Sequence, residues 1–125
     1  MRRMLIVEDE PDISSCLQDY FSSRGFAVST AFSGEQALEC LICACSEPEV
    51  VLLDVILPGI SGLEVLKRVK DLYPEARVIM VSGLTDPEVR EEAKSYGASD
   101  YVAKPFDFSD RTWSTAFCSA EPAWL

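Results

Sequence analysis

The sequence predicts an α/β domain built around a parallel sheet, and three observations support this prediction. Stretches with the apolar pattern of strands alternate with stretches that have the 3.6-residue period of helices, and the connections between them are short. The segment EVVLLDVIL at 49–57 is apolar on both alternating faces, as expected for a strand that helices cover on both sides. The length of 125 residues suits one domain, and neither an internal repeat nor a linker marks a second one.

The chain up to residue 45 predicts two strands and two helices in alternation. We expect these elements at 3–7 (RMLIV), 11–25, 26–31 (FAVSTA) and 33–45. Pro11 suits the first turn of the first helix and Gly25 suits its end, while Ser33 is the expected N-cap of the second helix. The residues expected to face the interior are Ile13, Leu17, Tyr20 and Phe21 in the first helix and Ala37, Leu38, Leu41 and Ile42 in the second.

The chain from residue 49 onward continues the alternation through three more strands. The expected elements are a strand at 49–57, a helix at 63–73, a strand at 77–83, a helix at 86–98 and a strand at 100–106. Pro74 ends the third helix and Gly97 stops the fourth, because neither residue suits a helix interior. The expected inward residues are Leu63, Leu66, Val69 and Tyr73 in the third helix and Val89, Ala93 and Tyr96 in the fourth.

The composition is that of an acidic globular protein, with 48% hydrophobic and 26% charged residues. A net charge of -10 argues against direct binding to nucleic acid, which needs a basic face, and against binding to an anionic membrane surface. No apolar run approaches the ~20 residues of a membrane span. The start MRRMLIV has too short an apolar stretch for a signal peptide, so we expect a cytoplasmic protein.

The five cysteines are expected to be reduced thiols, because their number is odd and no secretory signal is present. In the run CLICAC at 40–45, a helix would place Cys40 and Cys43 on one face and Cys45 elsewhere. The sequence has no histidine and no second cysteine pair at zinc-finger spacing. We therefore interpret the cysteines as buried small hydrophobic residues rather than as a metal or redox site.

The candidate functional residues lie at the carboxyl ends of four predicted strands. Glu8 and Asp9 follow the first strand, Asp54 belongs to the third, Ser82 to the fourth and Lys104 to the fifth. Right-handed crossovers place these ends at one edge of a parallel sheet, which is where open α/β sheets bind ligands. Taken singly, each residue also has an ordinary structural explanation. Glu8 and Asp9 could simply lie at a helix N-terminus, where the dipole favours acidic side chains, Ser82 could cap a helix and Lys104 could be an exposed turn residue. Their coincidence at one edge favours a shared function.

The residue types at this edge suit phosphoryl transfer assisted by a divalent cation. Crowded carboxylates such as Asp9 and Asp54 favour a bridging cation, and Mg2+ prefers one or two carboxylates together with waters and a phosphate oxygen. Asp54 would act as the nucleophile and form an acyl phosphate. Lys104 would stabilise the charge on the phosphoryl oxygens, and Ser82 would donate a hydrogen bond to one of them.

Four motifs resemble the receiver domain of two-component response regulators. They are VEDE after the first strand, LLDVILPGISG around Asp54, VSG at the end of the fourth strand and YVAKPF at the fifth. The resemblance extends from residue 3 to about residue 110, and the four motifs together are specific although each alone is weak. It implies a flavodoxin-like, doubly wound (βα)5 fold with the strand order 2-1-3-4-5.

The same resemblance implies the chemistry and the partners of the site. A sensor histidine kinase or a phosphotransfer protein would transfer a phosphoryl group to Asp54, with Mg2+ held by Glu8, Asp9, Asp54 and the backbone carbonyl of Ile56. On this interpretation the chain is a phosphoacceptor domain rather than an enzyme, and it catalyses only its own phosphorylation and dephosphorylation.

The resemblance also implies a conformational switch. Ser82 would move toward the phosphoryl group and Tyr101 would swing inward, which would reshape a binding face for a downstream protein target. Lys104 precedes Pro105, and the resemblance makes this bond a candidate cis peptide.

The resemblance ends where a receiver normally continues with a leucine-rich fifth helix. We expect a receiver domain at 1–110, followed at 111–125 by an atypical tail or a degenerate fifth helix that is short or irregular. Trp113 and Trp124 keep helical spacing with Phe117, but serine, threonine and proline make RTWSTAFCSAEPAWL a poor helix. We expect the two tryptophans to be exposed, either as an association liability or as a partner anchor, which makes a homodimer a candidate assembly.

Alternative functions stay open at this point. The chain could be a pseudo-receiver that binds proteins without phosphorylation, or the receiver fragment of a longer transcriptional regulator. A phosphohydrolase with an aspartyl-phosphate intermediate usually needs a second acid two residues after the nucleophile, where this sequence has Ile56. A flavin-binding protein of the same topology would need a Ser/Thr/Gly-rich phosphate loop after the first strand, which is absent.

Overall fold

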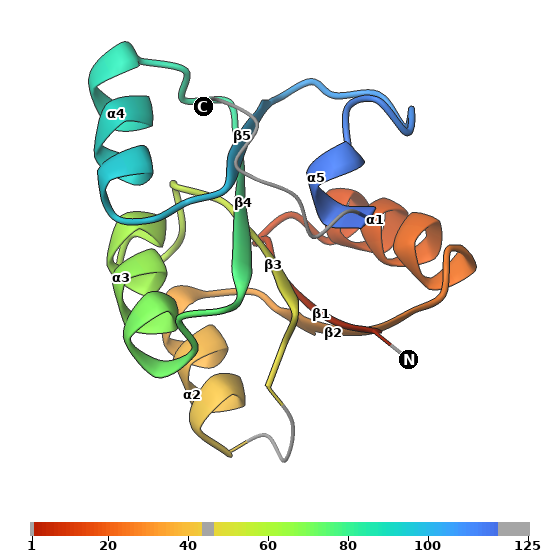
Figure 1. The fold of residues 1–125 in the computed structure, drawn as a ribbon, viewed down its shortest axis with the longest axis horizontal. Coiled ribbons are helices and arrows are strands. Elements are labelled where there is room, and N and C mark those ends of the chain that lie inside the picture. Colours follow the sequence, from red (N-terminus) through yellow and green to blue (C-terminus); the bar gives the residue numbers. More distant parts are fainter. Residues whose placement is uncertain (1, 44–46, 118–125) are drawn as a thin grey trace.

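Five strands and five helices alternate along residues 2–43 and 47–117, which are the residues that the computed structural model describes (Figure 1). The strands are β1 (Arg2–Val7), β2 (Phe26–Ala31), β3 (Val50–Leu53), β4 (Arg77–Ser82) and β5 (Asp100–Ala103). The helices are α1 (Pro11–Ser23), α2 (Gly34–Cys43), α3 (Gly62–Leu72), α4 (Pro87–Ser95) and α5 (Ser114–Phe117).

The strands form one parallel sheet in the order β2-β1-β3-β4-β5. Helices α1 and α5 cover one face of the sheet, and α2, α3 and α4 cover the other (Figure 1). The predicted doubly wound (βα)5 fold is therefore confirmed, as is the short fifth helix within the described residues. The third and fifth strands are shorter than predicted, because both stop where the chain turns into the loops at the carboxyl edge.

Two hydrophobic layers hold the helices on the sheet, and β1 contributes to both. Leu5 and Val7 belong to the layer under α2, α3 and α4, whereas Met4 and Ile6 belong to the layer under α1 and α5. This division follows from the two-residue period of a strand. All four residues of β3 are buried, which accounts for its uniformly apolar sequence.

The expected start and stop residues of the helices occupy their predicted places. Pro11 begins α1, and Gly25 follows its end with φ +93°, in the left-handed region that glycine tolerates. The hydroxyl of Ser33 accepts a hydrogen bond from the backbone N–H of Gln36 at 3.1 Å, as an N-cap does. Gly97 follows α4 with φ +100°.

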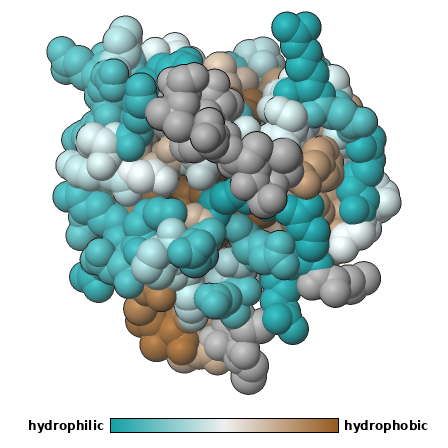
Figure 2. Space-filling model, in the orientation of Figure 1, coloured by the Kyte–Doolittle hydropathy of each residue, from teal (hydrophilic) through white to brown (hydrophobic). Residues whose placement is uncertain are grey.

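Two sequence predictions about α2 and the cysteines are wrong. Ile42 is 70% exposed, because Ala37 and Leu41 face the interior one turn apart and Ile42 lies about 100° further round the helix. Figure 2 shows a hydrophobic patch at the lower end of the molecule in this view, where α2 lies. Cys16 and Cys43 are exposed and Cys40 is half-buried, so none of the three described cysteines is a core residue. Cys45 and Cys118 lie outside the described residues.

The segment after β5 packs against the sheet through an aromatic cluster instead of leucines. This aromatic cluster consists of Tyr20, Phe21, Phe26, Phe106, Trp113 and Phe117. The predicted exposure of Trp113 is wrong: its side chain is fully buried, and its indole N–H donates to the carbonyl of Asp107 at 2.8 Å. The spacing of Trp113 and Phe117 turns both rings toward α1, whereas Trp124 lies outside the described residues.

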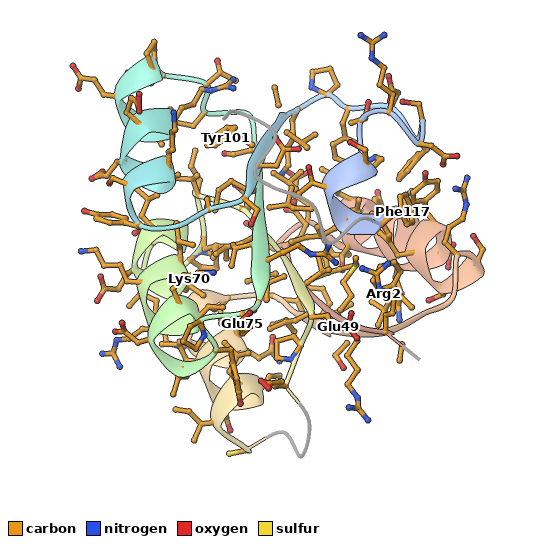
Figure 3. All side chains as sticks on the ribbon, in the orientation of Figure 1. Arg2, Glu49, Lys70, Glu75, Tyr101 and Phe117 are labelled. Atoms are coloured by element: carbon orange, nitrogen blue, oxygen red, sulfur yellow. The ribbon has the colours of Figure 1, made fainter. Side chains whose placement is uncertain are left out.

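Arg2 ties the first strand to the last helix. Its guanidinium donates to the carbonyls of Phe117 at 2.9 Å and Ala116 at 3.1 Å, and its Nε lies 3.2 Å from a carboxylate oxygen of Glu49 (Figure 3). These bonds satisfy carbonyls that the end of a helix leaves without partners. No helix within the described residues is long and apolar enough to cross a membrane.

Candidate functional site

The register of the sheet brings the candidate residues to one edge. Val7 pairs with Leu53, so Glu8 and Asp54 leave their strands side by side, and the backbone N–H of Asp54 donates to the carbonyl of Val7 at 3.1 Å. Two strands further along the sheet, the backbone N–H of Lys104 donates to the carbonyl of Ser82 at 3.0 Å. The structure therefore brings Glu8, Asp9, Asp54 and Lys104 together as predicted. Ser82 ends the strand next to Lys104 and contacts it through its backbone carbonyl.

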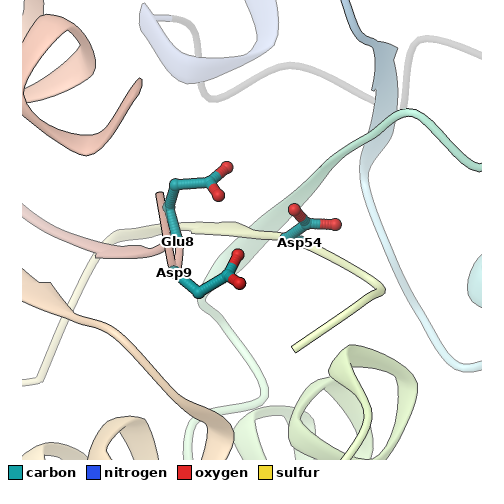
Figure 4. A group of neighbouring side chains, drawn as sticks. All are labelled: Glu8, Asp9 and Asp54. Carbon is teal, nitrogen blue, oxygen red and sulfur yellow. The ribbon is translucent and has the colours of Figure 1, made fainter. Parts of the chain in front are cut away.

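Three carboxylates meet at this edge, as Figure 4 shows. One oxygen each from Glu8, Asp9 and Asp54 lies within 4.8 Å of the other two. Glu8 is only 2% exposed and Asp54 only 5%, whereas Asp9 is exposed to solvent. Burial disfavours the charged form of a carboxylate, so the arrangement requires a positive partner.

Lys104 supplies one positive charge to two of these acids. Its Nζ lies 2.6 Å from Glu8 Oε1 and 2.7 Å from Asp54 Oδ2. Burial alone would lower the pKa of Lys104, but its hydrogen bonds to Asp54 and Glu8 outweigh this effect and raise the pKa. Burial raises the pKa of Glu8 in spite of the hydrogen bond with Lys104. The ion pair between Lys104 and Glu8 was not foreseen from the sequence, because nothing in the motifs distinguishes it from the pair with Asp54.

The acidic cluster fits a divalent cation. Three carboxylates face a single ammonium group, which leaves an excess of negative charge when all three are ionised. The donor atoms are oxygens, the ligands preferred by hard cations, and exposed Asp9 leaves the cluster open to solvent. The three acidic side chains that the resemblance assigns to a metal therefore lie close enough together to hold one.

The loop after β3 begins with a hydrogen bond to the candidate nucleophile. The backbone N–H of Ile56 donates to Asp54 Oδ1 at 3.0 Å, while Lys104 holds Oδ2. The Ile56 side chain is 62% exposed. The assignment of the Ile56 carbonyl as a metal ligand stays a prediction.

Ser82 and Tyr101 lie on the neighbouring strands β4 and β5, where Ser82 pairs with Ala103 and Tyr101 pairs with Met80. Ser82 is fully buried, and its hydroxyl accepts from the backbone N–H of Leu84 at 3.2 Å. It does not cap the following helix, because the side chain of Asp86 caps α4.

Tyr101 already occupies the inward position that the family resemblance assigns to the switched state. Its ring is 6% exposed and its hydroxyl donates to the carbonyl of Leu84. The guanidinium carbon of Arg90 in α4 lies 5.1 Å from the ring centroid, within the range of a cation–π contact. Burial raises the pKa of the Tyr101 hydroxyl. Tyr101 is therefore a buried residue, and Arg90 is a neighbour that the sequence pattern does not identify.

The bond between Lys104 and Pro105 is cis, as the resemblance implied. It directly follows β5, where Lys104 turns toward the acidic cluster. The fold and the edge residues together define a doubly wound α/β domain with a cluster of three acidic side chains at the carboxyl ends of its strands.

Comparison with known proteins identifies the family. The family model of the response regulator receiver domain matches residues 4–112, and the chain belongs to this family. Sporulation initiation phosphotransferase F of Bacillus subtilis is 36% identical over 108 residues, which cover 86% of this chain and 86% of that protein. The crystal structure of the receiver domain of NtrX from Brucella abortus matches with a TM-score of 0.82 and 34% identity, covering 93% of this chain and 96% of that one.

Other relatives are about twice as long as this chain. The transcriptional regulatory protein DltR of Streptococcus agalactiae is 36% identical over 105 residues, which cover 84% of this chain but 46% of DltR. Relatives of this kind are transcriptional regulators, so the expected absence of a nucleic-acid partner finds no support beyond the acidity of this domain. The chain is thus a response regulator receiver domain of a two-component system.

Proposed function

We propose that this domain accepts a phosphoryl group on Asp54, from a sensor histidine kinase or a phosphotransfer protein, in a reaction that depends on Mg2+. The observation that carries the proposal is the position of Asp54, a buried carboxylate that lies in one cluster with two further acids and a lysine. A phosphoacceptor needs this combination, because the incoming phosphoryl group and the aspartate are both negative.

The residues that would hold Mg2+ are Glu8, Asp9 and Asp54, together with the backbone carbonyl of Ile56. When bound there, the cation would neutralise charge on the phosphoryl oxygens and act as a Lewis acid. The three side chains supply oxygen ligands within 4.8 Å of one another, which supports this assignment.

Phosphorylation would proceed by attack of an Asp54 carboxylate oxygen on phosphorus. A new P–O bond forms while the P–N bond of the donor phosphohistidine breaks, and the electron pair of that bond stays on the departing imidazole nitrogen. Lys104 would exchange its contact with Asp54 for one with a phosphoryl oxygen, while its contact with Glu8 keeps the ammonium in place. In this proposal the domain is a substrate of phosphotransfer that assists its own reaction, not an enzyme acting on a separate substrate.

The output of the switch would pass through Ser82 and Tyr101. A phosphoryl group adds roughly -1.5 to -2 charge and three acceptor oxygens, to which the Ser82 hydroxyl would donate. The Ser82 hydroxyl now accepts a hydrogen bond from the backbone N–H of Leu84, and the Leu84 carbonyl accepts one from the Tyr101 hydroxyl. Movement of Ser82 would therefore change the β4–α4 segment that also bonds Tyr101. A downstream protein would read that change on the face formed by α4 and β5, and a homodimer through this domain is one form such a partner could take.

The second candidate function places the same chemistry in a longer regulator. The match to DltR over only 46% of that protein favours this arrangement, in which a separate domain would contact nucleic acid. We assign residues 1–110 to the receiver domain in both cases, with 111–125 as its atypical end. We also expect a cytoplasmic location, which the reduced thiols and the family favour.

The test is the intact mass of the protein after incubation with acetyl phosphate and Mg2+. Wild type should gain one phosphoryl group, and Asp54→Asn should gain none. Asp71→Asn is the matched control, because Asp71 is an exposed aspartate at the end of α3. A phosphoryl group that persists in Asp54→Asn would refute the site, and a wild type that gains no mass would favour the pseudo-receiver.

A further inference from the structure

The loop between β3 and α3 connects Asp54 to the first turn of α3, and its two ends are fixed from within. At its start, Asp54 accepts a hydrogen bond from the Ile56 backbone at 3.0 Å. At its far end, the Gly62 N–H donates to the carbonyl of Val55 at 2.8 Å, and the Ser61 side chain caps α3. The middle of the loop, residues 58–60, takes part in none of these bonds.

Glu35 in the first turn of α2 contacts this middle part. Its Oε2 accepts a hydrogen bond from the backbone N–H of Ile60 at 3.1 Å. Both carboxylate oxygens also lie against Gly59, so that a Cβ atom at this position would overlap with them. Gly59 has φ +78°, which is a second reason for glycine here.

The backbone of α2 adds shape to this contact. A Cβ atom at Gly34 would overlap with the Ile60 side chain and come within 3.0 Å of the Ile60 carbonyl. Gly34 therefore lets the start of α2 approach the loop closely, and Glu35 then bonds its backbone. None of the motifs that identify the family includes either residue.

We propose that Glu35 is a positioning residue for phosphorylation of Asp54, acting through the backbone of the β3–α3 loop. This inference rests on the proposed function, because the loop carries the Ile56 carbonyl assigned to the metal and the Ile56 N–H that bonds Asp54. Without the Glu35 contact the middle of the loop becomes more mobile. The N–H and the carbonyl of Ile56 then occupy a wider range of positions. Small displacements of such groups slow a reaction because its geometry is demanding.

The first experiment compares Glu35→Ala with Glu35→Gln and Glu39→Ala. Glutamine keeps an oxygen that can accept from Ile60, although it loses the charge. Glu39 lies one turn further along α2 and is exposed, and its side chain forms no hydrogen bond or ion pair with another described residue. It is therefore a control for removing a glutamate from the same helix.

We expect Glu35→Ala to lower the rate of phosphorylation by acetyl phosphate roughly 2- to 10-fold, the worth of one hydrogen bond, while Glu35→Gln and Glu39→Ala stay near wild type. Hydrogen exchange of the Ile60 amide should accelerate in Glu35→Ala alone, and NMR titration of the Gly59 and Ile60 amides should show weaker Mg2+ binding there. Glu35→Ala and Glu35→Gln both remove a charge that favours the helix N-terminus, so simple damage to α2 would lower the thermal stability of both variants. Loss of the hydrogen bond to Ile60 would affect Glu35→Ala alone.

A variant at Gly59 tests the contact from the other side. Gly59→Ala should slow phosphorylation in wild type, and the slowing should be smaller in the Glu35→Ala background, because the overlap with the carboxylate is then gone. Unchanged Ile60 exchange in Glu35→Ala, or equal slowing in Glu39→Ala, would overturn the proposal. If wild type gains no phosphoryl group, the proposed function fails, but Ile60 exchange still decides whether Glu35 holds the loop.

Discussion

The acidic rim lies at the carboxyl edge of the sheet, whereas the aromatic cluster lies mostly in the layer that covers one of its faces, and the two regions face opposite problems. The acidic rim, which we define as Glu8, Asp9, Asp54 and Lys104, gathers three carboxylates around one ammonium group. The aromatic cluster buries apolar rings at centroid distances such as 5.4 Å between Phe21 and Trp113, in edge-to-face contacts. Repulsion between carboxylates makes the acidic rim unfavourable for stability, whereas burial of apolar rings makes the aromatic cluster favourable.

This contrast indicates where the domain derives its stability. Buried charges that lack full compensation cost free energy, so we expect the rim to contribute less to the stability of the fold than the aromatic cluster does. The cluster has no such excess, since the polar atom of Trp113 is bonded to the Asp107 carbonyl. We therefore expect substitutions in the cluster to reduce stability, and substitutions in the rim to change binding and chemistry.

The largest effect on stability is expected for Trp113→Ala. Removing a fully buried aromatic ring leaves a cavity and should lower the free energy of unfolding by about 3–5 kcal/mol. Urea unfolding measures the change, and Phe108→Ala is the control, because Phe108 is 42% exposed. A loss below about 1 kcal/mol would show that the segment after β5 contributes little to the fold.

Lys104→Ala should separate the two roles of the rim. Without Mg2+ we expect a loss of roughly 1–3 kcal/mol, because Glu8 and Asp54 lose a charged hydrogen-bond partner. Mg2+ should still bind and should recover part of this loss, whereas most of the switching response should disappear. Thermal melts with and without Mg2+, with exposed Lys94→Ala as control, test this expectation. Loss of Mg2+ binding in Lys104→Ala would contradict it.

Asp9→Asn should remove stabilisation by Mg2+ without harming the metal-free protein. At a Mg2+ concentration ten times the dissociation constant, wild type should gain about 1.4 kcal/mol of stability. Asp9→Asn should gain much less at the same concentration, because a carboxylate ligand is gone. The neighbouring Glu10→Gln is the control, since its side chain lies outside the acidic cluster. Equal gains in wild type and Asp9→Asn would sink the metal assignment.

The smallest expected effect concerns the lifetime of the phosphoryl group. Ile56 and Leu84, two residues beyond Asp54 and Ser82, are apolar and cannot orient an attacking water. We predict slow autodephosphorylation and faster decay in an Ile56→Asn, Leu84→Glu double variant, by roughly 2- to 10-fold if one hydrogen bond to water is gained.

The single variant Ile56→Asn sharpens this test. Ile56 is 62% exposed, so its replacement costs little packing, whereas Leu84 is half-buried against the core. Decay of the phosphoryl group is followed by intact mass over time. If neither variant decays faster than wild type, shielding by these side chains does not limit hydrolysis.

Periodicity was a reliable guide wherever one face of an element is buried against a continuous layer. Leu17 and Phe21 in α1 and Leu66 and Val69 in α3 are buried as their spacing predicted. Periodicity is misleading at Ile42, because an apolar residue at the margin of the buried face of a helix can point toward the core or toward solvent. Helix propensity is a poorer guide at Trp113, because the segment has poor helix formers and yet one short turn suffices to bury the ring.

The amino-acid sequence was enough to predict the alternation of strands and helices, the residues that end each strand and the family to which their motifs belong. These features depend on local spacing and on residue chemistry, which a single chain displays directly. The folded structure was needed to show that Lys104 bonds both Glu8 and Asp54, that Tyr101 is buried beside Arg90 and that Glu35 accepts a hydrogen bond from the loop after Asp54. Such contacts join residues far apart in the chain, and their partners are selected by strand register and helix packing rather than by any local pattern.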